Sequence, residues 1–392
     1  MELTPKQMAG LNTAIERYHD GEKYTCISGY AGSGKSTLVK FIVSALQIPE
    51  EEICYTAFTG KACNVLQKKG NKNVCTLHRL LYEHFPRQDG TFFKRPKETL
   101  YPYTVIIVDE VSMASKDLMN QLFTHPVYVI CLGDPFQLPT INPADDNHLL
   151  DHPHVFLDEV HRQAQESEII RLSMDIRAQK SLELFDGHDV KVYNRDDLST
   201  GMLTWADQIL CGTNNTRIGI NTQMRDLLGR EGGPQDGDKV IALRNEWDTL
   251  SAEHEPLVNG TIGVLQNSYS TTRSYPRYIL NGGTFKVLHS DFYTDGDATY
   301  TDLNMDQVMI ETGEKCCSRE LEYKLNKNPR THGIVPLEFT YGYAITTHKA
   351  QGSQWPNVLV VEERFPFDKT EHARWLYTSV TRAEERLVLI RK

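Results

Sequence analysis

The sequence lacks the features that mark membrane-spanning, secreted and zinc-stabilised proteins. Its 392 residues contain no apolar run near the roughly 18–20 residues that cross a bilayer. The stretch from Met1 to Gln7 lacks the basic and then apolar layout of a signal peptide. The eight cysteines form no C-x-x-C pair and no Cys/His quartet at zinc spacing. We therefore expect a soluble, cytoplasmic protein with reduced thiols and no membrane partner.

Positive charge is in the minority, with 42 Lys and Arg against 52 Asp and Glu and a net charge of −10. This excess argues against a protein that coats nucleic acid non-specifically, although it leaves room for one basic groove. The 40% hydrophobic and 24% charged residues are typical of globular proteins. At about 100–200 residues per domain, the length predicts two or three domains.

The first part of the chain alternates short apolar segments with amphipathic ones. Strands are predicted at Tyr24–Ser28, Glu52–Thr56, Thr104–Val108 and Val127–Leu132, and helices at Lys35–Leu46, Gly60–Lys69 and Lys116–Phe123. Short, almost wholly apolar strands between helices predict a parallel sheet covered on both faces. Such a sheet binds its ligand at the carboxyl ends of the strands.

This pattern changes along the chain. Between Tyr82 and Glu98 it predicts a two-stranded excursion that turns at Asp89-Gly90. The alternation resumes after Asp158, with an amphipathic stretch at Glu168–Ala178. Short strands rich in Gly, Asn, Thr and Tyr then predict a small β insertion between about residues 237 and 336. Parallel-strand character is predicted again at Leu337–Ala344, Val358–Val361 and Arg386–Ile390.

The segment Gly29–Ser36 reads GYAGSGKS, a G-x-x-x-x-G-K-S pattern between a predicted strand and a predicted helix. Glycines let backbone N–H groups close around phosphate oxygens, and the helix N-terminus adds positive potential. Lys35 would reach the β- and γ-phosphates, and the Ser36 hydroxyl would coordinate Mg²⁺. A flexible glycine turn is the alternative. The predicted nucleotide-binding residues are Gly29, Ala31, Gly32, Ser33, Gly34, Lys35, Ser36 and Thr37.

Two further strand ends carry polar groups. Val105–Val108 runs directly into Asp109 and Glu110, so Asp109 would hold Mg²⁺ and Glu110 would orient and deprotonate the attacking water. These segments predict ATP or GTP hydrolysis. After the next strand, Gln137 could contact a γ-phosphate, although a proline-rich turn is an alternative explanation of this segment.

Nine motifs follow one another along the chain, from residue 3 to about residue 390. They are Leu3-Thr4-x-x-Gln7, the phosphate loop, Thr56–Ala62 (TAFTGKA), Thr76-Leu77-His78, Val108–Met113 (VDEVSM), Gly133–Pro139 (GDPFQLP), Glu159–Gln163 (EVHRQ), Thr346–Ser353 (TTHKAQGS) and Tyr377–Glu384 (YTSVTRAE). Their order resembles that of the superfamily 1 helicase motifs, specifically in the 5′→3′ DNA branch with its RecD-like and phage-type Dda-like stand-alone enzymes.

The resemblance implies roles for the matching positions. Gln7 would read the adenine edge and so select ATP, and Gly352 would join the nucleotide-binding residues. Arg162 and Arg382 would reach the γ-phosphate from the second domain as arginine fingers. A cation there is needed because charge builds up on the γ-phosphoryl oxygens during transfer.

DNA contacts are implied for Thr59, Lys61, Thr76, His78, Thr347, His348 and Lys349. Each of these Thr and His residues, taken alone, fits an ordinary helix cap or core residue equally well. The predicted excursion matches the strand-splitting pin of these helicases, where Phe85, Phe92 and Phe93 could stack on the last base pair. Packing of these rings on their own domain is the alternative. Phe58 stands where many relatives have Pro.

The resemblance implies two RecA-like P-loop parallel-sheet domains with a β-hairpin insertion in the first and an SH3-like insertion in the second. The expected limits are 1–150 with the hairpin at about 83–100, then 151–245 with 337–392, and 246–336 for the SH3-like insertion. The implied activity is ATP-dependent 5′→3′ unwinding of DNA by a monomer. Single-stranded DNA, duplex junctions and single-strand-binding or replication proteins are the expected partners, in a host cytoplasm if the gene is a phage gene. An RNA helicase, or an ATPase that displaces proteins without separating strands, is the alternative.

Overall fold

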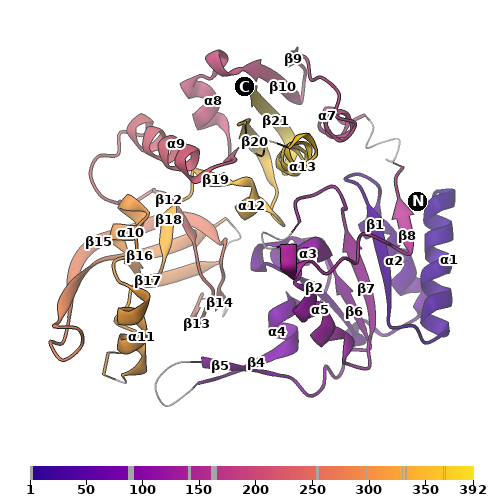
Figure 1. Ribbon diagram of the computed structural model, residues 1–392, viewed down its shortest axis with the longest axis horizontal. Coiled ribbons are helices and arrows are strands. Elements are labelled where there is room, and N and C mark those ends of the chain that lie inside the picture. Colours follow the sequence, from indigo (N-terminus) through magenta and orange to yellow (C-terminus); the bar gives the residue numbers. More distant parts are fainter. Residues whose placement is uncertain are drawn as a thin grey trace.

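The computed structural model describes residues 3–392 except 87–91, 140–142, 160–165, 253–255, 296–297, 329, 332, 365 and 367. The described residues form two six-stranded sheets with helices on their faces, a five-stranded antiparallel sheet and two two-stranded pairs (Figure 1). No helix in the described part of the chain is long and apolar enough to cross a membrane.

The first sheet is parallel and has the strand order β3-β2-β6-β7-β1-β8. Its strands are β1 (Tyr24–Gly29), β2 (Ile53–Ala57), β3 (Val74–Thr76), β6 (Val105–Val108), β7 (Tyr128–Gly133) and β8 (Val155–Leu157). The four strands predicted in this region are confirmed to within one residue at each end. They formed as predicted because nearly all their side chains are buried.

Helices cover both faces of this sheet. The first face packs against α1 (Pro5–His19) and α2 (Lys35–Leu46), and the second against α4 (Leu77–Leu81) and α5 (Lys116–Phe123). Successive residues of β6 alternate between them, since Ile107 belongs to the first core and Ile106 to the second. Helix α3 (Gly60–Lys68) packs beside the edge strand β3.

The second sheet, β19-β11-β20-β21-β10-β9, joins segments far apart in the sequence. It contains β9 (Phe185–Asp186), β10 (Val190–Asn194), β11 (Gln208–Cys211), β19 (Ala344–Thr346), β20 (Trp355–Val361) and β21 (Ala383–Arg391), all parallel except β9. One face packs against α7 (Glu168–Arg177) and α13 (Lys369–Val380), and the other against α8 (Thr200–Trp205) and α9 (Asn214–Leu227). Helix α12 (Thr347–Ala350) follows β19, and short 3-10 turns lie at Glu50–Glu52, Val111–Met113, Pro143–Asp145 and Arg195–Asp197.

The third sheet, β17-β16-β15-β12-β18, is the β insertion of the second domain. Its strands are β12 (Lys239–Ala242), β15 (Ile262–Tyr275), β16 (Gly283–Thr294), β17 (Thr299–Asp306) and β18 (Phe339–Tyr341). The pair β13 (Glu246–Leu250) and β14 (Pro256–Leu257) and the helices α10 (Gln307–Thr312) and α11 (Arg319–Lys327) complete it. Its SH3-like character stays a prediction.

Two expectations for this region were wrong. The strands are not all short, because β15 has 14 residues and β16 has 12. The segment Leu337–Ala344 does not return to the parallel sheet, since β18 pairs antiparallel with β12 and parallel pairing starts only at Ala344. Phe339 packs edge-on against Phe292 of β16, with ring centroids 5.2 Å apart, so burial in the insertion core holds β18 there.

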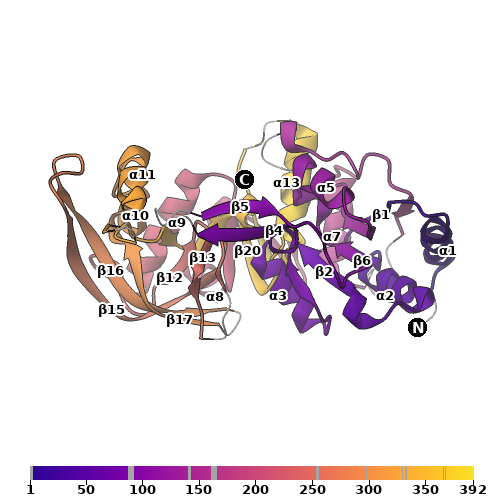
Figure 2. The ribbon, with the colours of Figure 1, turned by 90° about the horizontal axis from the view of Figure 1, so that it is seen from below.

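The predicted excursion forms the antiparallel hairpin β4 (Tyr82–Pro86) and β5 (Phe92–Pro96). Phe85 pairs with Phe93 across it, and the turn predicted at Asp89-Gly90 lies outside the described residues. The hairpin extends from the first domain toward the insertion in both views (Figures 1 and 2).

Candidate functional site

The phosphate loop connects β1 to α2, at the carboxyl end of a central strand. Gly32 and Gly34 have φ values of 76° and 80°, a left-handed conformation that glycine adopts without steric cost. A Cβ on Gly29 would lie 2.6 Å from the Ser33 Oγ, so this position also requires glycine. The glycines of the motif thus allow the loop to turn tightly before the helix.

Side chains around the loop are arranged for a phosphate ligand. Lys35 Nζ donates to the carbonyl oxygens of Gly29 and of Tyr30, the latter at 3.1 Å. The Ser33 hydroxyl is buried and has no hydrogen-bond partner among the described residues. Gln7 is buried and its Nε2 donates to the Ser33 carbonyl at 3.4 Å, which places the predicted adenine reader against the loop.

Asp109 and Glu110 follow β6, which is separated from β1 in the sheet by β7. Burial, and then the neighbouring Glu110 carboxylate, raise the pKa of Asp109 to about 6. The Glu110 N–H donates to Asp109 Oδ1 at 3.0 Å. Glu110 itself has a φ of 51°, a conformation that costs free energy in a non-glycine residue and is found most often at functional sites.

Gln137 connects the two domains at this site. With its amide nitrogen toward Glu110, Gln137 donates to Glu110 Oε2 at 3.2 Å and accepts from Arg382 Nη2 at 3.2 Å. The carboxylate predicted to act as the base, the amide and the predicted arginine finger therefore form one chain across the interdomain cleft.

Arg382 lies just after α13 and is only 3% exposed. Its Nε donates to the Thr378 carbonyl at 3.0 Å and its Nη1 to the Ser353 carbonyl at 3.3 Å. Arg382 forms no ion pair with a carboxylate of the described residues, so its positive charge is available to bind a phosphate group. The second predicted finger, Arg162, lies outside the described residues.

Two residues at this cleft were missed by the sequence analysis. Tyr377 on α13 accepts a hydrogen bond from the Ala31 N–H at 2.8 Å and donates to Asp134 Oδ2 at 2.6 Å. Asp134 follows β7 just as Asp109 follows β6, and this parallel could have marked it as a candidate. Nearby, the Arg177 guanidinium lies 3.5 Å from the centroid of the Tyr30 ring in the phosphate loop.

The residues present fit ATP and Mg²⁺. The unpartnered Ser33 hydroxyl and the glycine geometry of the loop suit phosphate oxygens, and the elevated pKa of Asp109 shows a carboxylate that a cation would stabilise. Mg²⁺ in such sites uses few protein ligands and takes others from phosphate and water. The absence of a cluster of three or more His, Cys, Asp or Glu side chains in the described chain is compatible with this.

A cavity of about 860 Å³ lies where the first domain, the second domain and the insertion meet. Five of the residues predicted to contact DNA line it, namely Thr59, Thr76, His78, His348 and Lys349. Thr59 and Thr76 also cap helices α3 and α4, accepting hydrogen bonds from the N–H groups of Ala62 and Arg79. Both threonines are therefore helix caps and also line the cavity.

The other described residues predicted to contact DNA or nucleotide are not among those that line this cavity. Thr347 is fully buried and its hydroxyl bonds to Ser379 Oγ at 2.8 Å, so it lies inside the second domain, and its neighbour Thr346 lines the cavity instead. Gly352 lies beside Thr59, the N-cap of α3, because a Cβ on Gly352 would be 3.1 Å from the Thr59 Oγ1. The side chains of Lys61, Phe85, Phe92 and Phe93 lie outside the described residues.

Arg217 is a cavity residue that the sequence analysis did not identify. It donates to Asn214 Oδ1 at 3.2 Å and to Thr340 Oγ1 at 3.1 Å, and no carboxylate pairs with it among the described residues. Burial lowers the pKa of Arg217, and burial together with the Arg217 charge lowers that of Lys349. Two neighbouring, partly desolvated cations favour an anionic ligand such as a phosphate backbone.

The insertion closes over this cavity. A Cβ on Gly60, the first residue of α3, would lie 2.3 Å from Val258 Cγ2 of the insertion. The Lys349 Nζ also donates to Asn259 Oδ1 at 2.8 Å. The insertion thus touches both the first domain and the cavity wall of the second.

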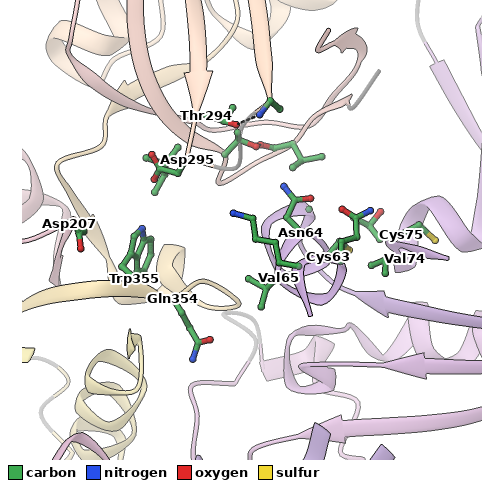
Figure 3. Close-up of a pocket in the computed structure, with 18 of the residues that line it drawn as sticks. Cys63, Asn64, Val65, Val74, Cys75, Asp207, Thr294, Asp295, Gln354 and Trp355 are labelled. Carbon is green, nitrogen blue, oxygen red and sulfur yellow. Dashed lines mark hydrogen bonds between the residues drawn. The ribbon is translucent and has the colours of Figure 1, made fainter. Parts of the chain in front are cut away.

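A second cavity of about 610 Å³ shares Gly60 and Val258 with the first as lining residues. Figure 3 shows it from within. Asn64 and Val65 of α3 face Gln354 and Trp355 of the second domain across it, with Asp295 of the insertion beside them. The lining of this second cavity contains both cationic side chains and carboxylates, and it includes none of the predicted catalytic residues.

Comparisons with known proteins find similar sequences along nearly the whole chain. The family model described as AAA domain matches residues 2–197, half of the chain, and the UvrD-like helicase C-terminal domain matches residues 341–390. The chain is 29% identical to the ATP-dependent DNA helicase dda of Enterobacteria phage T4, over 97% of each chain. It is 26% identical to the ATP-dependent RecD2 DNA helicase of Deinococcus radiodurans, over 93% of this chain and 46% of that one.

Solved structures show the same fold. The Pif1 helicase of Candida albicans superposes with a TM-score of 0.52 at 16% identity, covering 100% of this chain and 95% of that one. The Bacteroides Pif1 helicase in complex with ADP-AlF3 and single-stranded DNA gives 0.53 at 18% identity, covering 99% and 92%. The chain thus belongs to the AAA-domain family and is a superfamily 1 helicase of the RecD and Dda type.

Proposed function

We propose that this protein is an ATP-dependent DNA helicase that moves 5′→3′ along single strands and unwinds duplex DNA. The observation that carries the proposal is the Glu110–Gln137–Arg382 chain across the cleft. In our proposal these residues are the base, the sensor amide and the cation, and they meet only while both domains are in contact. Closure of the cleft is therefore required for hydrolysis, as a motor needs.

Hydrolysis follows from the residues around the phosphate loop. Lys35 and Arg382 neutralise charge on the transferred phosphoryl group, and Glu110 accepts a proton from the attacking water. Mg²⁺, held by the Ser36 hydroxyl and Asp109, would supply further neutralisation of the β- and γ-phosphate oxygens. Gln137 touches both Glu110 and Arg382, so loss of the γ-phosphate would be sensed on both sides of the cleft.

The nucleotide site and the DNA cavity share a wall. Gln351 lines the cavity, and its Nε2 donates to the Leu138 carbonyl at 2.7 Å, one residue from Gln137. A strand that displaces Gln351 would thus move the loop that carries the γ-phosphate sensor. The cavity offers hydroxyl, amide and cationic groups, which suit sequence-independent contacts to phosphates.

The direction of movement is inferred from relatives, and the mechanism of strand separation is inferred from the structure. We take the 5′→3′ direction from the similarity of the chain to the RecD2 and Dda helicases. For strand separation we propose the hairpin β4–β5, which extends from the first domain toward the insertion. Phe92→Ala should reduce unwinding and leave DNA-stimulated ATPase intact, whereas unchanged unwinding would remove the hairpin from the mechanism.

The remaining assignments are also proposals. We keep the predicted limits of the first domain, 1–150, and extend the insertion beyond the predicted 246–336, because the strands of its sheet run from Lys239 to Tyr341. A monomer that works at duplex junctions, with single-strand-binding or replication proteins as partners in the cytoplasm, completes the proposal.

The decisive experiment is ATP-driven unwinding of matched duplexes with only a 5′ or only a 3′ single-stranded tail. Lys35→Ala is the control, because it removes the phosphate-contacting ammonium. Unwinding of the 5′-tailed duplex alone, lost in the control, is expected. Activity on the 3′ tail would refute the direction. DNA-stimulated ATPase without unwinding would refute helicase action, and stimulation by RNA alone would move the substrate to RNA.

A further inference from the structure

The hydroxyl of Tyr377 forms hydrogen bonds across the interdomain cleft. Tyr377 belongs to the second domain, yet its hydroxyl bonds to two groups of the first, the Ala31 N–H and the Asp134 carboxylate. Tyr377 and Asp134 are each only 1% exposed. A buried hydroxyl bonded to a buried carboxylate is a strong, directional contact, because neither group can turn to water instead.

This contact joins the two loops that surround the nucleotide. Ala31 lies in the phosphate loop. Asp134 shapes the loop that presents Gln137, since its Oδ1 accepts the Phe136 N–H at 2.9 Å. The Phe136 ring also packs edge-on against the Tyr377 ring, with centroids 5.3 Å apart. One side chain of the second domain therefore holds both loops of the first in register.

The same helix places the arginine finger. Next to Tyr377, the Thr378 hydroxyl accepts the Leu138 N–H at 2.9 Å, and the Thr378 carbonyl accepts from Arg382 Nε at 3.0 Å. The guanidinium is thus tied to the helix turn that Tyr377 anchors on the first domain. A shift of that turn would move Arg382 away from Gln137 and Glu110.

We propose that Tyr377 is a positioning residue for hydrolysis, whose hydroxyl sets the place of Arg382 by fastening α13 to the phosphate loop and to the Asp134 loop. The role rests on the proposed function and adds a residue to which the family motif assigns no chemistry here. Tyr377 acts through Arg382 and the loops and does not touch the reacting atoms.

The test is Tyr377→Phe, measured by steady-state ATPase at saturating single-stranded DNA. We expect kcat to fall roughly tenfold, which is about 1.4 kcal/mol, while KM for ATP changes less than about threefold. The matched control is Tyr343→Phe, which removes another buried tyrosine–aspartate hydrogen bond of the second domain, to Asp238 at 2.8 Å. Its kcat should equal that of the wild type.

A double-mutant cycle with Arg382→Ala separates positioning from general stability. In the Arg382→Ala background, Tyr377→Phe should cause no further loss, because the group it positions is gone. A second variant, Asp134→Asn, puts an NH2 group where the Tyr377 hydroxyl needs an acceptor and should lower kcat in the same direction. Asp134→Asn replaces Tyr377→Phe as the test variant if circular dichroism shows that Tyr377→Phe is unfolded.

Three results would overturn the proposal: a kcat unchanged in the folded variant, a loss confined to KM, or full additivity with Arg382→Ala. Failure of the helicase assignment would look different, since the wild-type protein itself would then lack DNA-stimulated ATPase. Wild-type stimulation with an unaffected Tyr377→Phe refutes only the role of Tyr377.

Discussion

Asp109→Asn should make the protein more stable at neutral pH while abolishing its ATPase. The carboxylate is held at the end of β6, where burial and the Glu110 carboxylate raise its pKa to about 6. Asparagine keeps an acceptor for the Glu110 N–H, now 3.0 Å from Asp109 Oδ1, and removes the charge. The folded protein therefore loses a repulsion and keeps the hydrogen bond, whereas Mg²⁺ loses a proposed ligand.

The magnitude and its pH window follow from proton linkage. An unfolded Asp has a pKa of about 3.9, so between roughly pH 4 and pH 6 the folded chain binds more protons than the unfolded one. Stability of the wild type falls as pH rises through this window, and the penalty is fully present above pH 6. Two pKa units correspond to about 3 kcal/mol. Asp109 keeps some contact with solvent in the cleft, so we expect about 2 kcal/mol after screening.

Thermal unfolding monitored from pH 4 to pH 8 checks this prediction. The gain corresponds to a rise in Tm of about 4–8 °C at pH 8 for a domain of this size, shrinking toward zero near pH 4. Glu16→Gln serves as the control, because Glu16 is an exposed carboxylate of α1 without an ion pair among the described residues. A Tm difference that does not depend on pH, or a loss of stability at pH 8, would refute the reasoning.

Three further predictions follow from the site and the cavity. Glu110→Gln should lower kcat about 10²–10⁴-fold, because it removes the base, while a binding titration should show ATP affinity retained; retained turnover would exclude Glu110 as the base. Lys349→Ala should weaken single-stranded DNA binding and reduce the slope of log K against log salt by about 0.7, and a changed affinity with an unchanged slope would argue against a phosphate contact. Gly60→Ala should speed DNA dissociation in a stopped-flow chase, because its Cβ would lie 2.3 Å from Val258 Cγ2, whereas Gly219→Ala, where a Cβ meets nothing within 4 Å, should dissociate at the wild-type rate; equal rates for both variants would contradict closure of the cavity by the insertion.

Much of the nucleotide site could be predicted from the sequence because its signals are local. The glycines and Lys35 of the phosphate loop, and the acidic pair after β6, lie within a few residues of the strands that position them. Strand and helix type there depend on apolar runs and periodicity, which are properties of neighbouring residues. The parallel arrangement of the strands then places their carboxyl ends at one edge of the sheet.

Positions around the 860 Å³ cavity were harder to predict, because a shift of one residue along the chain moves a side chain from the cavity wall to the domain core. Thr346 lines the cavity while Thr347 bonds to Ser379 inside the second domain. The same limitation explains β18, whose apolar residues fit either sheet until Phe339 packs against Phe292. Arg217 gave no sequence signal, since its role depends on Lys349 lying beside it in space.

The sequence by itself determined the family, the phosphate loop, the acidic pair and most elements of the first domain. Only the tertiary structure decided which groups meet across the cleft: Gln137 with Glu110 and Arg382, and Tyr377 with Ala31 and Asp134. The physical reason is that motif spacing records local conformation, whereas these contacts form between domains whose sequences are far apart. Their distances and burial, and therefore their chemistry, are set by how the two sheets and their helices pack against each other.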